Sequence, residues 1–148
     1  MKKVYLASPL DALYREHIEK AKEVLKEKGF TVYAPLEHII PNAWDYPNQE
    51  WGLMVFTNDV SAIDDSDFVV VLSFGRKHIT SGTSWECGYA FAKGKKIILV
   101  EIDLGDSENF VMSLMVANGR YATVSGIKGL AEYDFNVLPK TRTETEQK

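Results

Sequence analysis

Short apolar runs alternate along this chain with longer stretches of helical periodicity. The apolar runs predict five strands, at residues 3–7, 30–34, 67–73, 97–101 and 121–124. The other stretches predict helices at about 11–28, 50–63, 109–118 and 127–133, and one more ending near residue 93. Such alternation is typical of a parallel sheet covered on both faces. The pattern therefore predicts a single-domain, doubly wound, flavodoxin-like α/β fold with five parallel strands over residues 1–139.

Apolar residues recur at helical spacing in the first two predicted helices. The first stripe consists of Tyr14, Ile18, Ala21 and Leu25, and the second of Leu53, Phe56, Val60 and Ile63. Stripes of this kind pack against a sheet, so we expect both sets to be buried. The segment 35–47 contains three prolines and predicts a long loop of the kind that often carries function. The polar segment 140–148 has no apolar anchor, and we expect a disordered tail there.

The hydroxyl-rich segment 80–84 opens a helix that carries one carboxylate, Glu86, among aromatic neighbours. A helix start presents unpaired backbone N–H groups that suit a polar or anionic ligand. A carboxylate in apolar surroundings is partly desolvated. It persists there only if it has a hydrogen-bond or ion-pair partner or serves the function of the protein. Doubly wound folds bind ligands at the carboxyl ends of their strands, and Glu86 follows the third strand. A second interpretation stays open at this point, an exposed first-turn Glu favoured by the helix dipole.

Two further residues are candidates for the same site. Asp59 lies on the flank of the second predicted helix and is either a solvated or a functional carboxylate. Tyr5 lies in the first strand and is either a core tyrosine or the donor that holds a carboxylate in position. Two carboxylates without metal or histidine indicate chemistry at an anomeric carbon, where one of them attacks the sugar.

Composition and charge argue against several other classes of protein. The net charge is −4 and no basic run occurs, so we expect no nucleic-acid partner. The apolar runs have the length of strands, and we expect no membrane association. His17, His38 and His78 are scattered and the glycine-rich nucleotide motifs are missing, so we expect no metal and no cofactor. A single cysteine, Cys87, and an N-terminus without a signal-peptide pattern favour a cytoplasmic protein.

Four segments, in this order and spacing, carry a family resemblance. They are VYLASP at residues 4–9, TNDV at 57–60, SGTSWECGYA at 81–90 and SLM at 113–115, and YDFN at 133–136 adds to them. The chain resembles the nucleoside 2-deoxyribosyltransferases and the related 2'-deoxynucleoside 5'-monophosphate N-glycosidases. This resemblance implies an enzyme of nucleotide salvage that acts on nucleosides or deoxynucleotides and free nucleobases.

The resemblance also implies residue roles. Glu86 matches the nucleophile that holds the 2-deoxyribosyl group as an ester, Tyr5 the tyrosine that orients it, and Asp59 the aspartate near the base. The positions that match substrate-binding residues are Ser8, Pro9, Thr80, Ser81, Gly82, Ser113 and Met115. Ser113 and Met115 match positions that reach into a neighbouring subunit, which implies a homo-oligomer built from dimers, such as a tetramer or hexamer.

Three departures from the family pattern bear on the activity. Thr80 stands where many transferases have an aspartate, and Ser113 where they have an asparagine, which resembles the monophosphate glycosidases. In contrast, the first loop, SPLD at residues 8–11, lacks an arginine for phosphate and resembles the transferases. The charged C-terminus replaces a terminal aromatic residue found in several transferases. We therefore expect a deoxyribosyltransferase, with an N-glycosidase as the alternative and a non-catalytic nucleotide-binding module as a more distant one.

Overall fold

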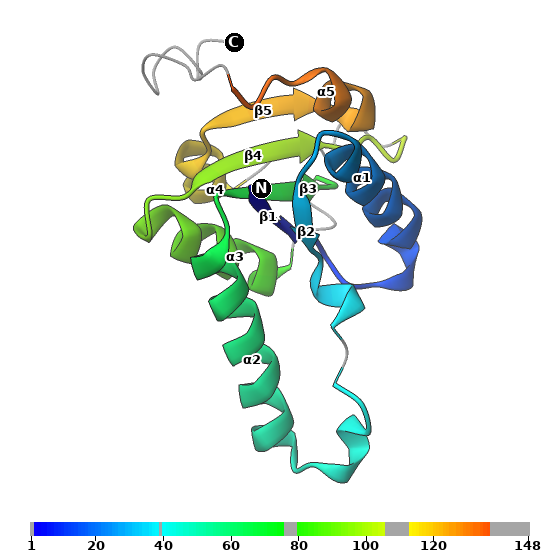
Figure 1. Cartoon of the computed structure of the whole chain (residues 1–148), viewed down its shortest axis with the longest axis vertical. Helices are drawn as coiled ribbons and strands as arrows, with labels where there is room; N and C mark the ends of the chain where they lie inside the picture. The colour runs from blue at the N-terminus through cyan, green and yellow to red at the C-terminus, as the bar shows by residue number, and fades with distance from the viewer. Residues whose placement is uncertain (1, 39, 76–79, 106–112, 137–148) are drawn as a thin grey trace.

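The computed structural model describes residues 2–38, 40–75, 80–105 and 113–136, and Figure 1 shows the path of the chain. The strands are β1 (Lys3–Ala7), β2 (Thr31–Tyr33), β3 (Phe68–Ser73), β4 (Lys96–Glu101) and β5 (Ala122–Ser125). They form one sheet in the order β2-β1-β3-β4-β5, and each neighbouring pair is parallel. This order confirms the predicted flavodoxin-like topology, and it places the switch point between β1 and β3.

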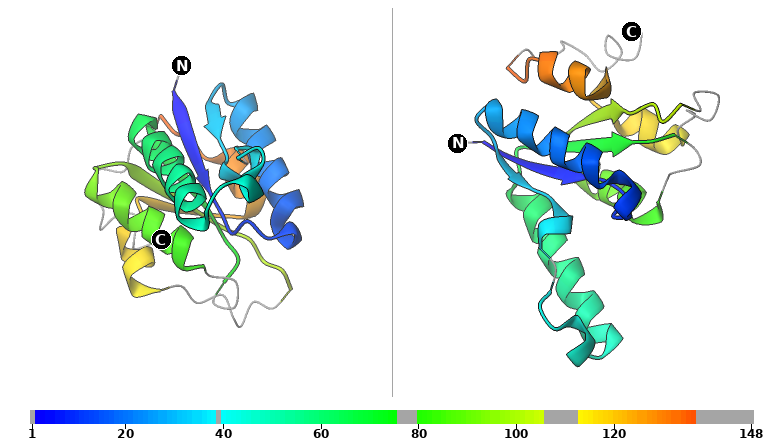
Figure 2. Two further views of the ribbon diagram at one scale, coloured as in Figure 1. Left: turned by 90° about the horizontal axis from the view of Figure 1, so that it is seen from below. Right: turned by 90° about the vertical axis from the view of Figure 1, so that its right-hand side faces the viewer.

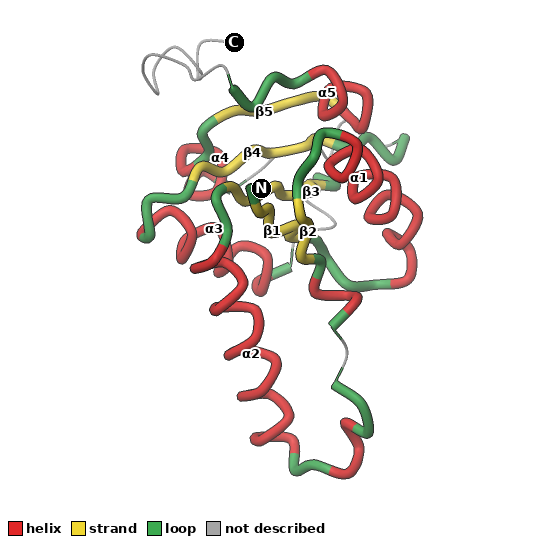
Figure 3. Tube along the Cα trace, viewed as in Figure 1, coloured by secondary structure: helices red, strands yellow, loops and turns green. Residues whose placement is uncertain are grey.

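Helices cover both faces of the sheet (Figures 2 and 3). A 3-10 turn (Ala12–Tyr14) leads into α1 (Arg15–Glu27), which packs beside α5 (Gly126–Glu132) on one face. On the other face lie α2 (Asn48–Asp65), α3 (Ser81–Ala92) and α4 (Leu114–Gly119).

The sheet separates two apolar clusters. Successive residues of a strand point to opposite faces. Val4 and Leu6 therefore join the cluster under α1 and α5. Tyr5 and Ala7 join the smaller cluster beside α2 and α3.

The two predicted apolar stripes have different outcomes. The stripe of α1 is buried as predicted, and Gly29 ends the helix with a φ of 91° that favours glycine. The prediction for α2 is wrong in its first half, because only Ile63 of its stripe is fully buried and Leu53 is 65% exposed. The first turns of α2 project beyond the sheet (Figure 1), which agrees with the exposure of these side chains in the described part of the chain.

The predicted loop at 35–47 is confirmed in its described residues, with two short 3-10 helices at Pro35–Glu37 and Ala43–Asp45. It leads out to the exposed start of α2, and Trp44 is 82% exposed. The helix predicted at 109–118 is observed as α4 at Leu114–Gly119, and residues 109–112 of that prediction lie outside the described part. The predicted tail at 140–148 also lies outside it.

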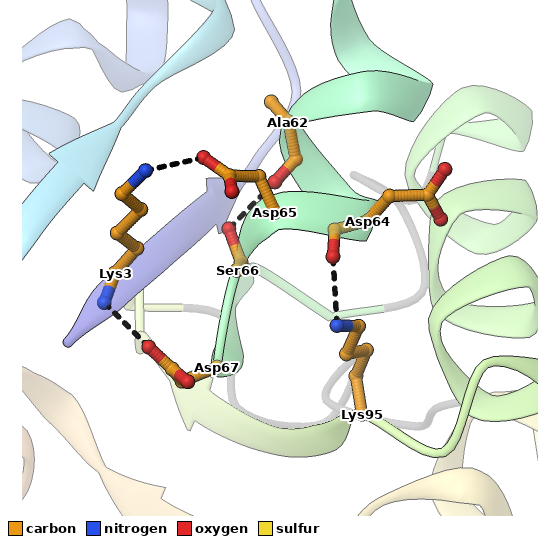
Figure 4. A network of polar contacts seen from close by, with 7 residues as sticks. All are labelled: Lys3, Ala62, Asp64, Asp65, Ser66, Asp67 and Lys95. Carbon is orange, nitrogen blue, oxygen red and sulfur yellow. Dashed lines mark hydrogen bonds and ion pairs between the residues drawn. The ribbon is translucent and has the colours of Figure 1, made fainter.

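A polar network fixes the last turn of α2 against its neighbours (Figure 4). Lys3 Nζ pairs with Asp65 Oδ2 at 2.5 Å, and the backbone N–H of Lys3 donates to Asp67 Oδ2 at 2.8 Å. From the other side, Lys95 Nζ donates to the carbonyl of Asp64 at 2.8 Å. Because these contacts join the end of α2 to β1 and to the loop before β4, they hold the inner part of α2 over the sheet.

Candidate active site

A cavity of about 700 Å³ opens beside the carboxyl end of β1, between α2 and α3. Its wall consists of Ser8, Pro9 and Leu10 after β1, one flank of α2 that includes Asp59, and the start of α3 from Thr80 to Glu86. We call this the Glu86 cavity. It lies where the topology predicts a ligand site.

Glu86 occupies the second turn of α3 and is half-buried, so it is not the exposed first-turn Glu of the alternative interpretation. The hydroxyl of Tyr5, which is fully buried, donates a hydrogen bond to Glu86 Oε2. Burial raises the pKa of Glu86 to about 7, the charge of Asp59 raises it too, and the Tyr5 hydrogen bond opposes both. Glu86 therefore changes its ionisation near neutral pH, which suits a catalytic carboxylate.

Tyr5 remains a donor under all ordinary conditions. Its burial, together with the neighbouring charge of Glu86, raises the pKa of the phenol far above its usual range. A neutral hydroxyl in a fixed position then holds one oxygen of Glu86 and leaves the other available to the cavity.

Asp59 lies on the inner part of α2 and is half-buried. The hydroxyl of Tyr33 donates to Asp59 Oδ1 at 3.2 Å. Burial raises the pKa of Asp59, whereas the Tyr33 hydrogen bond and the nearby His38 lower it. The two carboxylates interact, so they titrate as a pair.

The start of α3 presents hydroxyl groups to the cavity. Thr80 is the N-cap residue, and its Oγ1 accepts a hydrogen bond from the backbone N–H of Thr83 at 3.3 Å. Ser81 and Gly82 follow it in the wall. Thr80 thus caps the helix that carries Glu86.

The structure brings together most of the residues that the sequence singled out. Those that line the Glu86 cavity are Ser8, Pro9, Asp59, Thr80, Ser81, Gly82 and Glu86. Tyr5 lies behind Glu86 and touches it without lining the cavity. Ser113 and Met115 lie elsewhere, at the start of α4, where they line a separate hollow of about 360 Å³ against α3.

Two neighbours of the site were missed in the sequence. Tyr33 stacks on Tyr5 with ring centroids 5.6 Å apart, and His38 stacks on Tyr33 at 4.0 Å. A signal for Tyr33 exists in the sequence, since it stands near the end of the second predicted strand as Tyr5 stands in the first. The register that pairs them is visible only in the folded sheet.

Cys87 takes no part in this chemistry. It is 4% exposed, and burial raises the pKa of its thiol to about 12. A thiol of that kind stays protonated and behaves as a small hydrophobe. Among the described residues, no three His, Cys, Asp or Glu side chains gather as a metal site would require. Within those same ranges, no helix combines the length and apolarity needed to cross a membrane.

The model of one protein family, Nucleoside 2-deoxyribosyltransferase, matches residues 4–115. The chain belongs to this family. Its structure is similar to that of a 2-deoxyribosyltransferase from Bacillus psychrosaccharolyticus, with 30% identity and a TM-score of 0.80 over 93% of this chain and 96% of that one. A CMP N-glycosidase from Clostridium botulinum, BcmB, is 26% identical with a TM-score of 0.59, and 92% of this chain and 100% of that one are covered.

A conserved protein from Enterococcus faecalis V583 shares the fold at 24% identity, with a TM-score of 0.69 over 89% of this chain and 96% of that one. No curated protein matches the chain. The solved structures that resemble this chain therefore include a 2-deoxyribosyltransferase and an N-glycosidase.

Proposed function

We propose that this deoxyribosyltransferase family member moves 2-deoxyribose between nucleobases through an ester on Glu86. The observation that carries the proposal is the buried Tyr5 hydroxyl on Glu86, at the wall of a cavity that Asp59 shares. A carboxylate with a pKa of about 7 is ionised in a useful fraction at neutral pH. It is also basic enough to attack an anomeric carbon.

In the first step Glu86 attacks C1' of the donor nucleoside while the bond from C1' to the base nitrogen breaks. The electron pair of that bond stays on the base, and a proton from the Asp59 carboxyl neutralises it. In the second step a nitrogen of the acceptor base attacks C1', the Glu86 carboxylate leaves, and the proton of the acceptor passes to Asp59. Two displacements at one carbon give net retention.

The pair of carboxylates must carry one proton for this sequence. The reactive arrangement has Glu86 ionised and Asp59 protonated. The Tyr5 hydrogen bond favours it, because a donor stabilises the charged form of Glu86. The transition state resembles an oxocarbenium ion. A 2'-hydroxyl would withdraw electrons from that cation and crowd Glu86, so we expect 2'-deoxy substrates.

The charge of the cavity wall bears on the nature of the substrate. Glu86 and Asp59 give the cavity wall a negative potential when ionised, and this repels a phosphate dianion. The repulsion favours a nucleoside over a nucleoside monophosphate. The alternative, a 2'-deoxynucleoside 5'-monophosphate N-glycosidase with water as acceptor, draws support from the hydroxyls of Thr80 and Ser113 and from the likeness to the CMP N-glycosidase.

We also propose that the protein is a homo-oligomer in which a neighbouring subunit completes the site. Apolar side chains on α2 and α4 support it, since Leu53, Leu114 and Met115 are 65%, 79% and 84% exposed. Exposed large apolar residues that adjoin one another, as Leu114 and Met115 do on α4, often mark a subunit interface. A cytoplasmic location is also part of the proposal, since the one cysteine is a buried free thiol.

A product assay separates the candidate activities. We expect purified protein to convert deoxyadenosine and cytosine into deoxycytidine and adenine, resolved by liquid chromatography, and to leave dAMP intact. Release of adenine from dAMP without transfer would favour the glycosidase instead. Tight nucleotide binding without any product would favour the non-catalytic module.

A further inference from the structure

Tyr33 repeats on β2 the arrangement that Tyr5 has on β1. The two residues are register partners in neighbouring parallel strands, so their side chains leave the same face of the sheet. Their rings stack with centroids 5.6 Å apart and planes 14° apart. Two phenols thus stand side by side under α2 and α3.

Each phenol serves one of the two carboxylates. The hydroxyl of Tyr5 donates to Glu86 on α3, and that of Tyr33 donates to Asp59 Oδ1 on α2. Neither tyrosine belongs to the described wall of the Glu86 cavity. Tyr33 therefore acts through Asp59, without contact to a substrate.

The ring of Tyr33 is held by a second stacking partner. His38 lies 4.0 Å from it between centroids, with the two planes 3° apart. Both side chains line a separate hollow of about 560 Å³ between β2 and α2. A ring packed in this way loses little further freedom when its hydroxyl engages a carboxylate, so Asp59 receives a donor in a fixed place.

We propose that Tyr33 is a positioning residue for the reaction, whose hydroxyl fixes Asp59 Oδ1 and leaves Oδ2 to exchange the proton with the nucleobase. This inference rests on the proposed function. The groups that face Asp59 are Tyr33 from β2, His38 from the loop after it, Tyr5 from β1 and Glu86 from α3. Of these, Tyr33 is the one with a hydrogen bond to it in the structure.

The test is Tyr33→Phe, which keeps the ring and removes the hydroxyl. Without the donor, ionised Asp59 is less stable and holds its proton to higher pH. We expect the acid limb of the kcat/KM profile to move upward by about one pH unit. The free energy of one hydrogen bond to a partly exposed charge corresponds to a pKa shift of about that size. We also expect kcat to fall about tenfold, as loss of orientation does in other sites, while KM stays nearly constant.

Tyr89→Phe is the matched control. The Tyr89 hydroxyl also donates to an aspartate on α2, Asp64 Oδ1 at 2.7 Å, but neither residue lines the Glu86 cavity. We expect its pH profile and kcat to equal those of the wild type. A carboxyl-carbon NMR titration of Asp59 in wild type and Tyr33→Phe gives a readout that needs no turnover, and we expect its pKa to rise in the variant.

An unchanged acid limb in an active Tyr33→Phe enzyme, or an unchanged Asp59 titration, overturns the inference. Its failure differs from failure of the proposed function. If the wild type neither transfers deoxyribose nor hydrolyses dAMP, the proposed function is wrong. In that case the NMR titration still decides whether Tyr33 controls Asp59.

Discussion

Glu86→Gln is expected to lose at least about 10³-fold in kcat for deoxyribosyl transfer, because the amide cannot form the glycosyl ester. The change is nearly isosteric, so the Tyr5 hydroxyl keeps an oxygen acceptor at the same place. We expect the variant to bind deoxyadenosine with an affinity close to that of the wild type. Single-turnover kinetics with chromatography, together with calorimetric titration, measure the two effects separately.

The matched control for this change is Glu132→Gln. Glu132 lies at the end of α5, on the opposite face of the sheet, and is exposed. We expect the control to retain the wild-type rate. Retention of a large part of the activity by Glu86→Gln would contradict the assignment of the nucleophile.

Asp59→Asn is the second change with a large expected effect. We expect kcat to fall by about 10²- to 10⁴-fold, the range for loss of a general acid, because an amide cannot protonate the departing base. The loss should be smaller for a donor with an activated leaving group, which needs no proton. Rates for deoxyadenosine and for such a donor, measured side by side, test this role.

The same variant is expected to change the shape of the pH profile. The wild type needs one proton on the pair, so its rate declines above about 7, where Glu86 and Asp59 have both released theirs. An amide at position 59 carries no charge to raise the pKa of Glu86, so that pKa falls. The rising limb of the variant's pH profile should therefore lie below pH 7, and its rate should stay constant at alkaline pH.

Asp64→Asn is the control for both measurements. It removes a carboxylate from the same helix, but Asp64 is exposed and does not line the Glu86 cavity. We expect the wild-type rate and a bell-shaped profile. If Asp59→Asn also kept the alkaline decline, the proton that matters would reside on another group.

The fold could be read from the chain because strand and helix periodicities agree along its length. In β1 the alternation that sends Val4 to one cluster sends Tyr5 to the other, which puts the tyrosine on the side of α2 and α3. The position of Glu86 followed from topology, since a helix after β3 begins near the switch point. These features depend on local pattern and chain order, both of which a single sequence records.

Other features depend on contacts between distant segments. The apolar stripe of α2 signals burial, but it does not say what covers the helix, and within one chain Phe56 stays 50% exposed. Tyr33 was missed because its role depends on the register of β2 with β1 and on the reach of its hydroxyl to α2. Neither the register of two strands nor the distance from a hydroxyl to a distant helix follows from a periodic pattern in the sequence.

The proposed reaction depends on a covalent bond between C1' of the sugar and Glu86. Incubation with a slow 2'-deoxy-2'-fluoroarabinosyl nucleoside should trap this ester, and mass spectrometry of the tryptic peptide of residues 78–93 can locate it. We expect the fluorosugar mass on Glu86 in the wild type and none in Glu86→Gln. An enzyme that transfers deoxyribose but carries the adduct on any other residue would contradict the account.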